Sequence, residues 1–111
     1  MTEKENGIIY KYYNEELEST YFKFNGKKEG EYKSYYGNGQ LYCTRNYKND
    51  ELEGEYKYYH RNGQLWKIYN YKNNKLEGEY KSYYENRELF VIYNYKNDKI
   101  EEDINHIMKN G

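Results

Sequence analysis

A chain of 111 residues is the size of one domain. Its 18 basic and 19 acidic residues give a net charge of −1, which argues against a nucleic-acid binder because such domains are normally basic. One cysteine and two histidines provide neither an internal disulfide nor a zinc-ligand pattern. Low aliphatic content would usually indicate disorder, but 19 tyrosines supply large apolar bodies that favour strands, so we expect a folded protein.

The first ten residues, MTEKENGIIY, lack a basic segment and a long apolar run, so we expect no signal peptide. No stretch of the chain is apolar enough, for long enough, to span a membrane. We therefore expect a soluble protein of the cytoplasm, a reducing compartment in which Cys43 remains a semi-buried thiol on a strand.

The chain is built from a 24-residue repeat, which appears when a glycine at the same point of each copy is aligned. A fixed period in this range indicates an array of supersecondary units. In the residues before the first complete copy, Asn6 is the counterpart of the glycine. Three copies align without a gap: 30–53 from Gly30, 54–77 from Gly54 and 78–101 from Gly78.

The two ends of the array depart from the pattern, as capping copies do. Residues 6–29 read as a degraded first copy in which Ile8 stands where Tyr32 stands. Residues 102–111 read as a partial closing strand. We expect a single repeat domain over residues 1–111.

Two turn signals per repeat divide the chain into strands of about 7–9 residues, or about nine antiparallel strands in a meander. Asn-Gly favours a type I′ turn with positive φ at both residues, so Arg87 in the glycine position predicts a looser turn. The expected fold is all-β: a single elongated, twisted antiparallel β-meander built from 24-residue β-hairpin repeats. The first signal is Asn38-Gly39, Asn62-Gly63 and Asn86-Arg87, and the second is Asn49-Asp50, Asn73-Asn74 and Asn97-Asp98.

Two-residue loops at these turns would determine the cross-strand partners by counting. Aromatic residues then face each other in each complete repeat, and acids face bases, both of which stabilise a sheet. A strand glycine also lies beneath a tyrosine, which shields it. The predicted pairs are Tyr35 with Tyr42, Tyr59 with Trp66, Tyr83 with Phe90, Glu53 with Lys72, Glu77 with Lys96, and Gly54 with Tyr71; in the first copy Lys11 faces Glu18.

The same register predicts two unlike faces. The Tyr-rich face carries Tyr32, Tyr36, Leu41, Cys43, Tyr47, Leu52, Tyr56, Tyr58, Leu65, Tyr69, Tyr71, Leu76, Tyr80, Tyr84, Leu89, Val91, Tyr93, Tyr95, Ile100 and Ile104. The polar face carries Glu31, Lys33, Glu53, Glu55, Lys57, Lys72, Glu77, Glu79, Lys81 and Lys96.

An apolar stripe runs through the predicted polar face and is the candidate partner-binding site, because exposed Tyr and Trp are enriched at interaction hot spots. Cross-strand stabilisation of the sheet is the competing explanation, and both roles are compatible. The stripe consists of Tyr35, Tyr42, Tyr59, Trp66, Ile68, Tyr83, Phe90 and Ile92.

A single flat sheet cannot bury an apolar face. The sheet can curl so that the Tyr-rich face lines a trough, two sheets can pair face to face, or a partner can cover the face. We expect strong twist and curl, with dimerisation as an additional arrangement.

The repeat motif resembles the MORN-repeat variant family, the second class of membrane occupation and recognition nexus repeats. The resemblance covers about residues 8–110 and implies stacked β-hairpins in an elongated antiparallel sheet. It also implies functions that range from protein scaffolding to binding at membrane lipids, and bacterial members are often labelled antitoxin-like. The motif is carried by Gly54, Tyr56, Tyr59, Asn62, Gly63, Leu65, Tyr71, Asn73 and Gly78, with equivalents in the neighbouring repeats.

We therefore expect a scaffold that binds another protein, with self-association as a further option. An antitoxin or immunity protein is a special case of this function. Membrane phospholipid binding is the alternative, because lysines recur every 24 residues on one face, although neighbouring glutamates make that face mixed in charge. Carbohydrate binding is a weaker fourth reading. The lysines are Lys33, Lys57 and Lys81.

An enzyme is not expected, because the chain has no nucleophile–base set, phosphate loop or metal cluster. His60 occupies the position of Tyr36 and Tyr84 and reads as a repeat variant, while His106 has no recurring carboxylate partner. We accordingly expect no cofactor, no metal and no nucleic acid.

Overall fold

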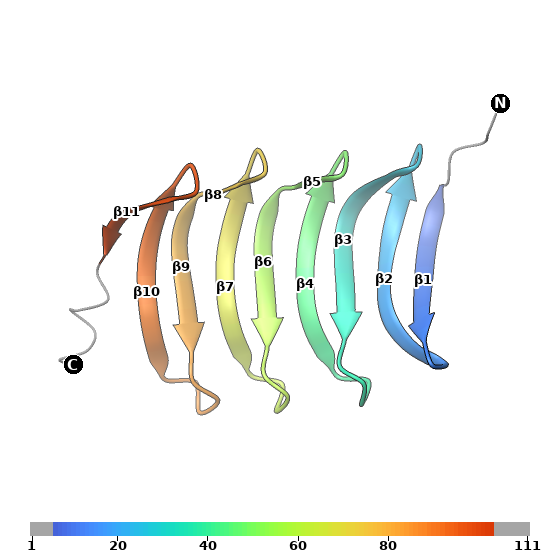
Figure 1. The fold of residues 1–111 in the computed structure, drawn as a ribbon, viewed down its shortest axis with the longest axis horizontal. Coiled ribbons are helices and arrows are strands. Elements are labelled where there is room, and N and C mark those ends of the chain that lie inside the picture. Colours follow the sequence, from blue (N-terminus) through green and yellow to red (C-terminus); the bar gives the residue numbers. More distant parts are fainter. Residues whose placement is uncertain (1–5, 104–111) are drawn as a thin grey trace.

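The computed structural model describes residues 6–103, which form one open antiparallel sheet without a helix (Figure 1). Neighbours in the sheet are neighbours in the chain, so the sheet is a meander. Its strands are β1 (Gly7–Tyr13), β2 (Glu16–Phe24), β3 (Lys27–Tyr35), β4 (Leu41–Lys48), β5 (Glu51–Leu52), β6 (Gly54–Tyr59), β7 (Leu65–Lys72), β8 (Lys75–Leu76), β9 (Gly78–Tyr83), β10 (Leu89–Lys96) and β11 (Lys99–Asp103).

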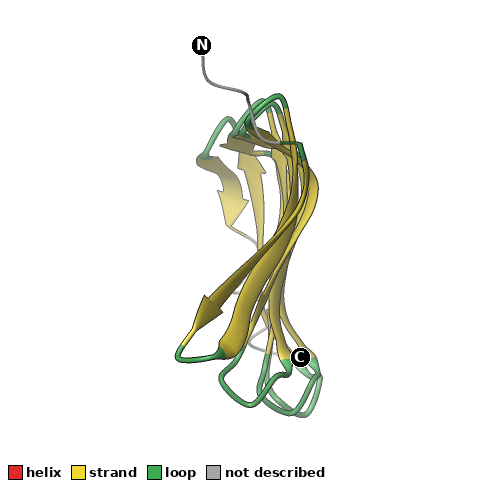
Figure 2. Cartoon of the chain, turned by 90° about the vertical axis from the view of Figure 1, so that its right-hand side faces the viewer, coloured by secondary structure: helices red, strands yellow, loops and turns green. Residues whose placement is uncertain are grey.

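The expected elongated, twisted meander of hairpin repeats is confirmed. The two-residue strands β5 and β8 pair only with β4 and β7, so the continuous path across the sheet has nine strands. The molecule measures 59 × 33 × 15 Å, the thickness of one layer, and the sheet twists and bends along its strands (Figure 2). Among the described apolar residues only Tyr21, Cys43 and Tyr56 are buried, so this part of the chain has no conventional core.

The strand bounds leave two residues in each of the turns at the top of Figure 1, as expected. Asn49 and Asp50 have φ of +52° and +68°, and the Asn73-Asn74 and Asn97-Asp98 turns repeat these values closely. Positive φ at both residues is the type I′ geometry, and Asn and Asp tolerate it better than other non-glycine residues. Glycine is therefore not needed at this corner of the repeat.

Each upper turn is hydrogen-bonded to the previous repeat. The Asp50 amide donates to the Lys28 carbonyl at 3.0 Å, and the Asp50 carboxylate accepts from the Lys28 amide at 2.7 Å. The Asn49 amide donates to the Glu29 carboxylate at 3.1 Å. The same three bonds join Asn73-Asn74 to Leu52 and Glu53, and Asn97-Asp98 to Leu76 and Glu77.

The lower turns of the three complete repeats differ from the type I′ prediction, which is wrong here. The Gly39 amide donates to the Tyr36 carbonyl at 2.9 Å, and the Tyr36 amide donates to the Gln40 carbonyl at 2.8 Å. Gly39 has φ of +89°, whereas Asn38 does not have positive φ and instead accepts the Gln40 amide on its side-chain oxygen. The turn therefore has a wider loop than two residues, with one left-handed residue before the strand.

Arg87 does not loosen its turn, contrary to expectation. Its amide donates to the Tyr84 carbonyl at 2.9 Å, and the Tyr84 amide donates to the Glu88 carbonyl at 2.8 Å. These are the bonds of the glycine-containing turns, and Arg87 adopts φ of +77° to make them. The strain is therefore concentrated in one residue rather than spread over the loop.

A one-residue bulge follows each wide lower turn and changes which face the next side chain occupies. Tyr58 pairs with Lys67, but Tyr59 pairs with Leu65, so Trp66 is the extra residue. The predicted pairing of Tyr59 with Trp66 is wrong for this reason, because a shift of one residue exchanges the faces of a strand. The equivalent pairs are Tyr35 with Leu41 and Tyr83 with Leu89, in place of the predicted Tyr35 with Tyr42 and Tyr83 with Phe90.

Near the upper turns the pairing register shifts by two residues. Because side chains alternate between the faces with a period of two, this shift leaves every side chain on the face predicted for it. Tyr47 pairs with Leu52, and Thr44 with Lys57, so the second strand has two more residues between these pairs than the first. Gly54 lies in this interval with φ of +88°, and it faces Tyr71 as predicted. A Cβ at Gly54 would lie 4.0 Å from the Cβ of Asn46, an ordinary contact, so its backbone angle rather than crowding requires glycine.

The predicted acid–base pairs beside these glycines are not formed. Gly54 with Tyr71 is the last pair of β6 with β7, and the Glu53 carboxylate accepts the Asn73 amide instead of facing Lys72. Glu77 likewise accepts the amide of Asn97 rather than facing Lys96.

The first copy is offset by one residue from the gap-free alignment. Its turn, Asn14-Glu15, has only two residues, so Ile9 rather than Ile8 takes the place of Tyr32. Gly7, with φ of +115°, is the counterpart of the repeat glycine in place of Asn6. Lys11 pairs with Ser19, not with Glu18, and so lies on the Tyr-rich face. The predicted closing strand is described as far as Asp103; Ile104, His106 and the rest of 104–111 lie outside the described residues.

Arg87→Gly should stabilise the protein by about 0.5–1 kcal/mol. A non-glycine residue in the left-handed region destabilises the folded state by about 1–2 kcal/mol. Glycine removes this strain, but its greater entropy in the unfolded chain offsets about 0.5–1 kcal/mol of the gain. Gly63→Arg, at the same turn position one repeat earlier, is the matched control and should destabilise. Urea unfolding followed by circular dichroism measures both, and equal stability of Arg87→Gly and wild type would contradict the assignment of strain.

Candidate functional site

A row of stacked side chains crosses the Tyr-rich face. Tyr21 stacks on Tyr32 with ring centroids 5.2 Å apart, and further along the sheet Tyr69 stacks between two rings at 5.0 and 5.1 Å. One residue comes from each long strand from β2 to β10, which is why successive members lie alternately 11 and 13 residues apart in the sequence. The central row consists of Tyr21, Tyr32, Arg45, Tyr56, Tyr69, Tyr80 and Tyr93.

Arg45 replaces a tyrosine in this row. Its guanidinium carbon lies 4.1 Å from the centroid of the Tyr32 ring, and its Nη1 donates to the Tyr56 hydroxyl at 2.7 Å. A planar guanidinium can stack as a ring does, so the row stays continuous. The hydrogen bond and the nearby phenols raise the pKa of Arg45 despite its burial, so it stays charged.

The two faces differ in how their cations are paired: on the Tyr-rich face Arg45 and other cations lie over aromatic rings, whereas on the polar face lysines pair with glutamates. Lys28 and Lys67 also lie over aromatic rings of the Tyr-rich face, with Lys28 Nζ 5.0 Å from the Tyr47 ring centroid and Lys67 Nζ 4.7 Å from that of Trp66. On the polar face, each of the lysines that recur every 24 residues forms an ion pair with a glutamate two residues earlier on its own strand. These pairs are Lys33–Glu31 at 3.5 Å, Lys57–Glu55 at 3.2 Å and Lys81–Glu79 at 3.4 Å.

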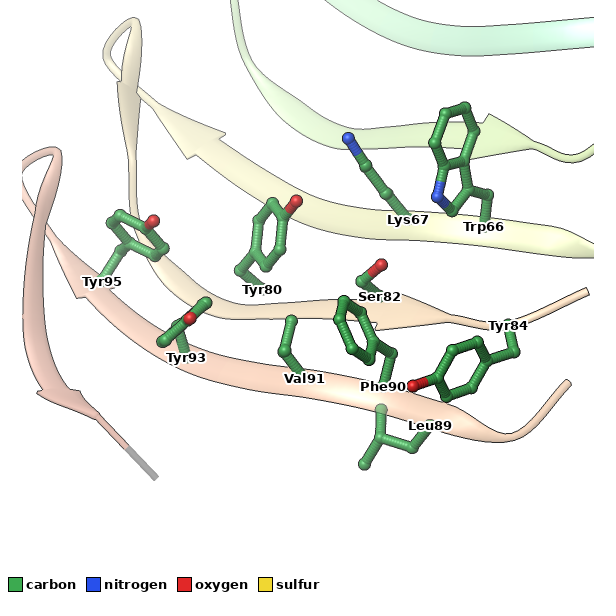
Figure 3. A pocket seen from close by; sticks show the side chains of 10 residues that line it. All are labelled: Trp66, Lys67, Tyr80, Ser82, Tyr84, Leu89, Phe90, Val91, Tyr93 and Tyr95. Atoms are coloured by element: carbon green, nitrogen blue, oxygen red, sulfur yellow. The ribbon is translucent and has the colours of Figure 1, made fainter. Parts of the chain in front are cut away.

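An open trough of about 930 Å³ lies on the Tyr-rich face between β7 and β10 (Figure 3). In Figure 3 the rings of Trp66, Tyr80 and Phe90 stand up from their strands around the trough, while Leu89 extends away from them. Phe90 and Tyr84 are each 51% exposed. The remaining lining residues are Lys67, Ser82, Val91, Tyr93 and Tyr95.

Ser82 and Val91 leave room for the trough because both side chains are small. Ser82 and Val91 stand where the preceding repeat has Tyr58 and Lys67. Tyr58 packs against Tyr56 at 5.2 Å, and its ring fills the corresponding space in that repeat. The first complete repeat also has small residues at these positions, Ser34 and Cys43, but there the Tyr58 ring of the next repeat packs against Tyr42 at 5.2 Å.

The predicted stripe is divided between the two faces. The bulged residues Tyr42, Trp66 and Phe90 lie on the Tyr-rich face, where they contact Tyr36, His60 and Tyr84 respectively. Tyr35, Tyr59, Tyr83, Ile68 and Ile92 remain on the polar face. Leu41, Leu65 and Leu89, predicted on the Tyr-rich face, are moved by the bulge to the polar face.

The lower turns are joined between repeats by side chains of the Tyr-rich face. The Tyr36 hydroxyl donates to the Tyr59 carbonyl at 2.6 Å, and His60 Nε2 lies 2.8 Å from the Tyr83 carbonyl in the equivalent contact. His60 is thus a repeat variant with the role of Tyr36. Within residues 6–103 no three His, Cys, Asp or Glu side chains are placed to hold a metal, and no helix is long and apolar enough to cross a membrane.

The repeats are those of a known family. The family model of the MORN repeat variant matches residues 28–49, 52–73 and 76–97, one match for each complete copy. The chain belongs to the MORN repeat variant family. Comparison with curated proteins and with solved structures found no match. MORN repeats are generally protein- or lipid-binding scaffold modules of a non-enzymatic class, which directs attention to the surfaces of this MORN-variant sheet.

Replacing Arg45 tests how the row of this MORN-variant sheet is held. Arg45→Ala should destabilise the protein by about 2 kcal/mol, because it removes a desolvated cation–π contact and leaves a gap between two rings. Arg45→Tyr, which restores the residue found at Tyr69 and Tyr93, should stay within about 1 kcal/mol of wild type. Chemical unfolding of both variants provides the comparison, and equal destabilisation by Ala and Tyr would show that the charge itself is required.

Burial raises the pKa of Tyr69 well above its ordinary value of 10.0, and neighbouring phenols add to the shift. The neutral phenol is favoured in the folded state, so this stabilisation is complete below pH 10 and is lost as the pH rises above it. Tyr69→Phe should raise the midpoint of alkaline unfolding, measured by circular dichroism and tyrosinate absorbance. Tyr13→Phe, at a residue 69% exposed outside the row, is the control, and an equal shift in both variants would contradict the prediction.

Proposed function

We propose that this MORN-variant sheet is a non-enzymatic scaffold that binds another protein, and that the partner docks in the trough between β7 and β10. The observation that carries the proposal is the trough itself, an open aromatic surface with half-exposed Phe90 and Tyr84 at its side. Clustered Tyr, Trp and Phe are the side chains that contribute most at protein interfaces.

The lining also favours a particular partner chemistry. Lys67 is the cation of the trough, and none of the lining residues is acidic. A partner segment with an apolar side chain next to a carboxylate would fill the aromatic hollow and place its charge near Lys67. Of the predicted stripe, Trp66 and Phe90 belong to this proposed site, whereas Tyr59 and Tyr83 belong to the opposite face.

Phospholipid binding through the recurring lysines has less support. Lys33, Lys57 and Lys81 each lie within 3.5 Å of a glutamate oxygen on the same strand, so the lysine row has no net charge to attract anionic headgroups. The stacked rings of the central row present their edges rather than their faces, which also disfavours flat sugars or bases on the row.

The trough can be filled with side chains that this fold already accommodates. Ser82→Tyr with Val91→Lys gives the last complete repeat the residues of the preceding one, so the sheet should remain as stable as wild type. Partner capture from host lysate should then fall at least about tenfold, a loss of 1.4 kcal/mol or more. Quantitative mass spectrometry of material bound to the tagged protein measures the loss.

The matched control is Ile68→Thr with Ile92→Thr on the polar face, where the equivalent residue of an earlier repeat is Thr44. This variant should retain the partner. Loss in the control with retention in the filled variant would move the site to the polar face, and the absence of any stoichiometric protein partner would contradict the proposed function.

A further inference from the structure

The polar face loses its charges at the β1 end of the sheet. In each complete repeat this face carries a Glu–Lys ion pair on one strand, such as Glu31 with Lys33 at 3.5 Å. With the one-residue offset of the first copy, the equivalent residues of β1 are Ile8 and Tyr10. An ion pair that the sheet repeats three times is thus replaced by two apolar side chains.

The neighbouring strand shows the same replacement. Phe22 of β2 faces Ile8, and Phe22 and Phe24 stand where β4 has Asn46 and Lys48. Together these residues form what we call the N-terminal apolar patch, with the following exposed fractions: Ile8 61%, Tyr10 58%, Tyr12 64%, Phe22 40% and Phe24 56%.

The patch is large for a surface that contacts only water. Five half-exposed side chains of this size present about 500 Å², which approaches the largest apolar patch of a typical monomer. None of the five is charged, and the adjoining Glu31–Lys33 pair is neutral. A second identical patch would therefore meet no charge repulsion.

The patch adjoins an open edge of the sheet. β1 is seven residues long, pairs only with β2, and contains one charged residue, Lys11, and no proline. Lys11 Nζ lies over the Tyr21 ring, 5.8 Å from its centroid, on the Tyr-rich face, so the polar-face side of this edge carries no charge. The edge is available for pairing with another strand, because half of its backbone groups face away from the sheet.

We propose that two copies of this chain associate through β1, pairing antiparallel across a two-fold axis so that their N-terminal apolar patches join. A two-fold register centred on Tyr10 places Tyr10 opposite its own counterpart and Ile8 opposite Tyr12 of the second copy. Aromatic–aromatic and aromatic–β-branched pairs of this kind stabilise antiparallel strands. The symmetry axis also keeps both Tyr-rich faces on one side of the continuous sheet.

The self-pairing of β1 has a limited area. Edge pairing buries the facing flanks of these side chains and leaves their outer surfaces exposed. The area removed from water is therefore below the about 1,000 Å² of the two patches, and the dimer should depend on concentration. It involves the other face and the other end of the sheet from the trough, so it does not rest on the proposed partner. Failure to find that partner would leave this inference unaffected.

The test gives the first copy the residues of the complete repeats. Ile8→Glu, Tyr10→Lys, Phe22→Asn and Phe24→Lys are combined in one variant, and sedimentation equilibrium is measured over a hundredfold range of concentration. The wild type should rise from the chain mass of 13.8 kDa toward twice that value, and the variant should remain at the chain mass. Tyr10→Lys alone gives a milder version if the combined variant does not fold. Ile68→Thr with Ile92→Thr, on the same face but distant from β1, should dimerise like wild type.

Amide hydrogen exchange identifies the geometry. The β1 amides that point away from β2 should be protected at high wild-type concentration and unprotected in the variant. A wild type that is monomeric at every concentration would overturn the proposal. So would a dimer that survives the patch substitutions, or a dimer that forms without protecting these amides, since that result would show contact between faces instead of pairing of β1.

Discussion

A sheet one layer thick must be held by contacts that pass from strand to strand, and the central row of the Tyr-rich face is the most extensive of them. Each stacked pair contributes about 0.5–1.5 kcal/mol beyond the area it buries. Because the row takes one side chain from every long strand between β2 and β10, each ring inside the row is supported from both sides. The row therefore holds the strands together as a hydrophobic core does in other folds, although most of its members are only partly buried.

The row is reinforced at both ends of the strands. The upper turns bind the previous repeat through backbone and carboxylate bonds, and the lower turns do so through the Tyr36 hydroxyl and His60. Each repeat is thus joined to the next at the upper turn, at the central row and at the lower turn. The free energy of unfolding then becomes a sum of contacts between neighbouring repeats. Such an array tolerates variation inside one copy as long as the contacts to its neighbours remain, as the exchange of Tyr36 for His60 illustrates.

The sequence was sufficient to predict the repeat period, the meander, the upper turns and the register in the middle of the strands, because each depends on local residue preferences repeated three times. It was insufficient for the bulge after the lower turn. No residue type identifies a single bulged residue such as Trp66 in the sequence, and an aromatic side chain is compatible with either face of the sheet. The available signal was the glycine: a wide turn needs positive φ only at Gly63, so Asn-Gly did not require a two-residue loop. That ambiguity alone divided the predicted stripe, and the shorter turn at Asn14-Glu15 shifted the first copy by one residue.

Departures from the repeat carry more functional information than the repeat itself. Where copies agree, a residue is explained by contacts that every repeat must make, as for the Glu–Lys pairs of the polar face. Where one copy differs and the sheet does not, the difference changes only the surface. Ser82 and Val91 leave open a space that Tyr58 fills in the preceding repeat, and Ile8 and Tyr10 put apolar side chains where the other copies place an ion pair. Both differences change the chemical character of the surface at which a partner or a second copy would dock.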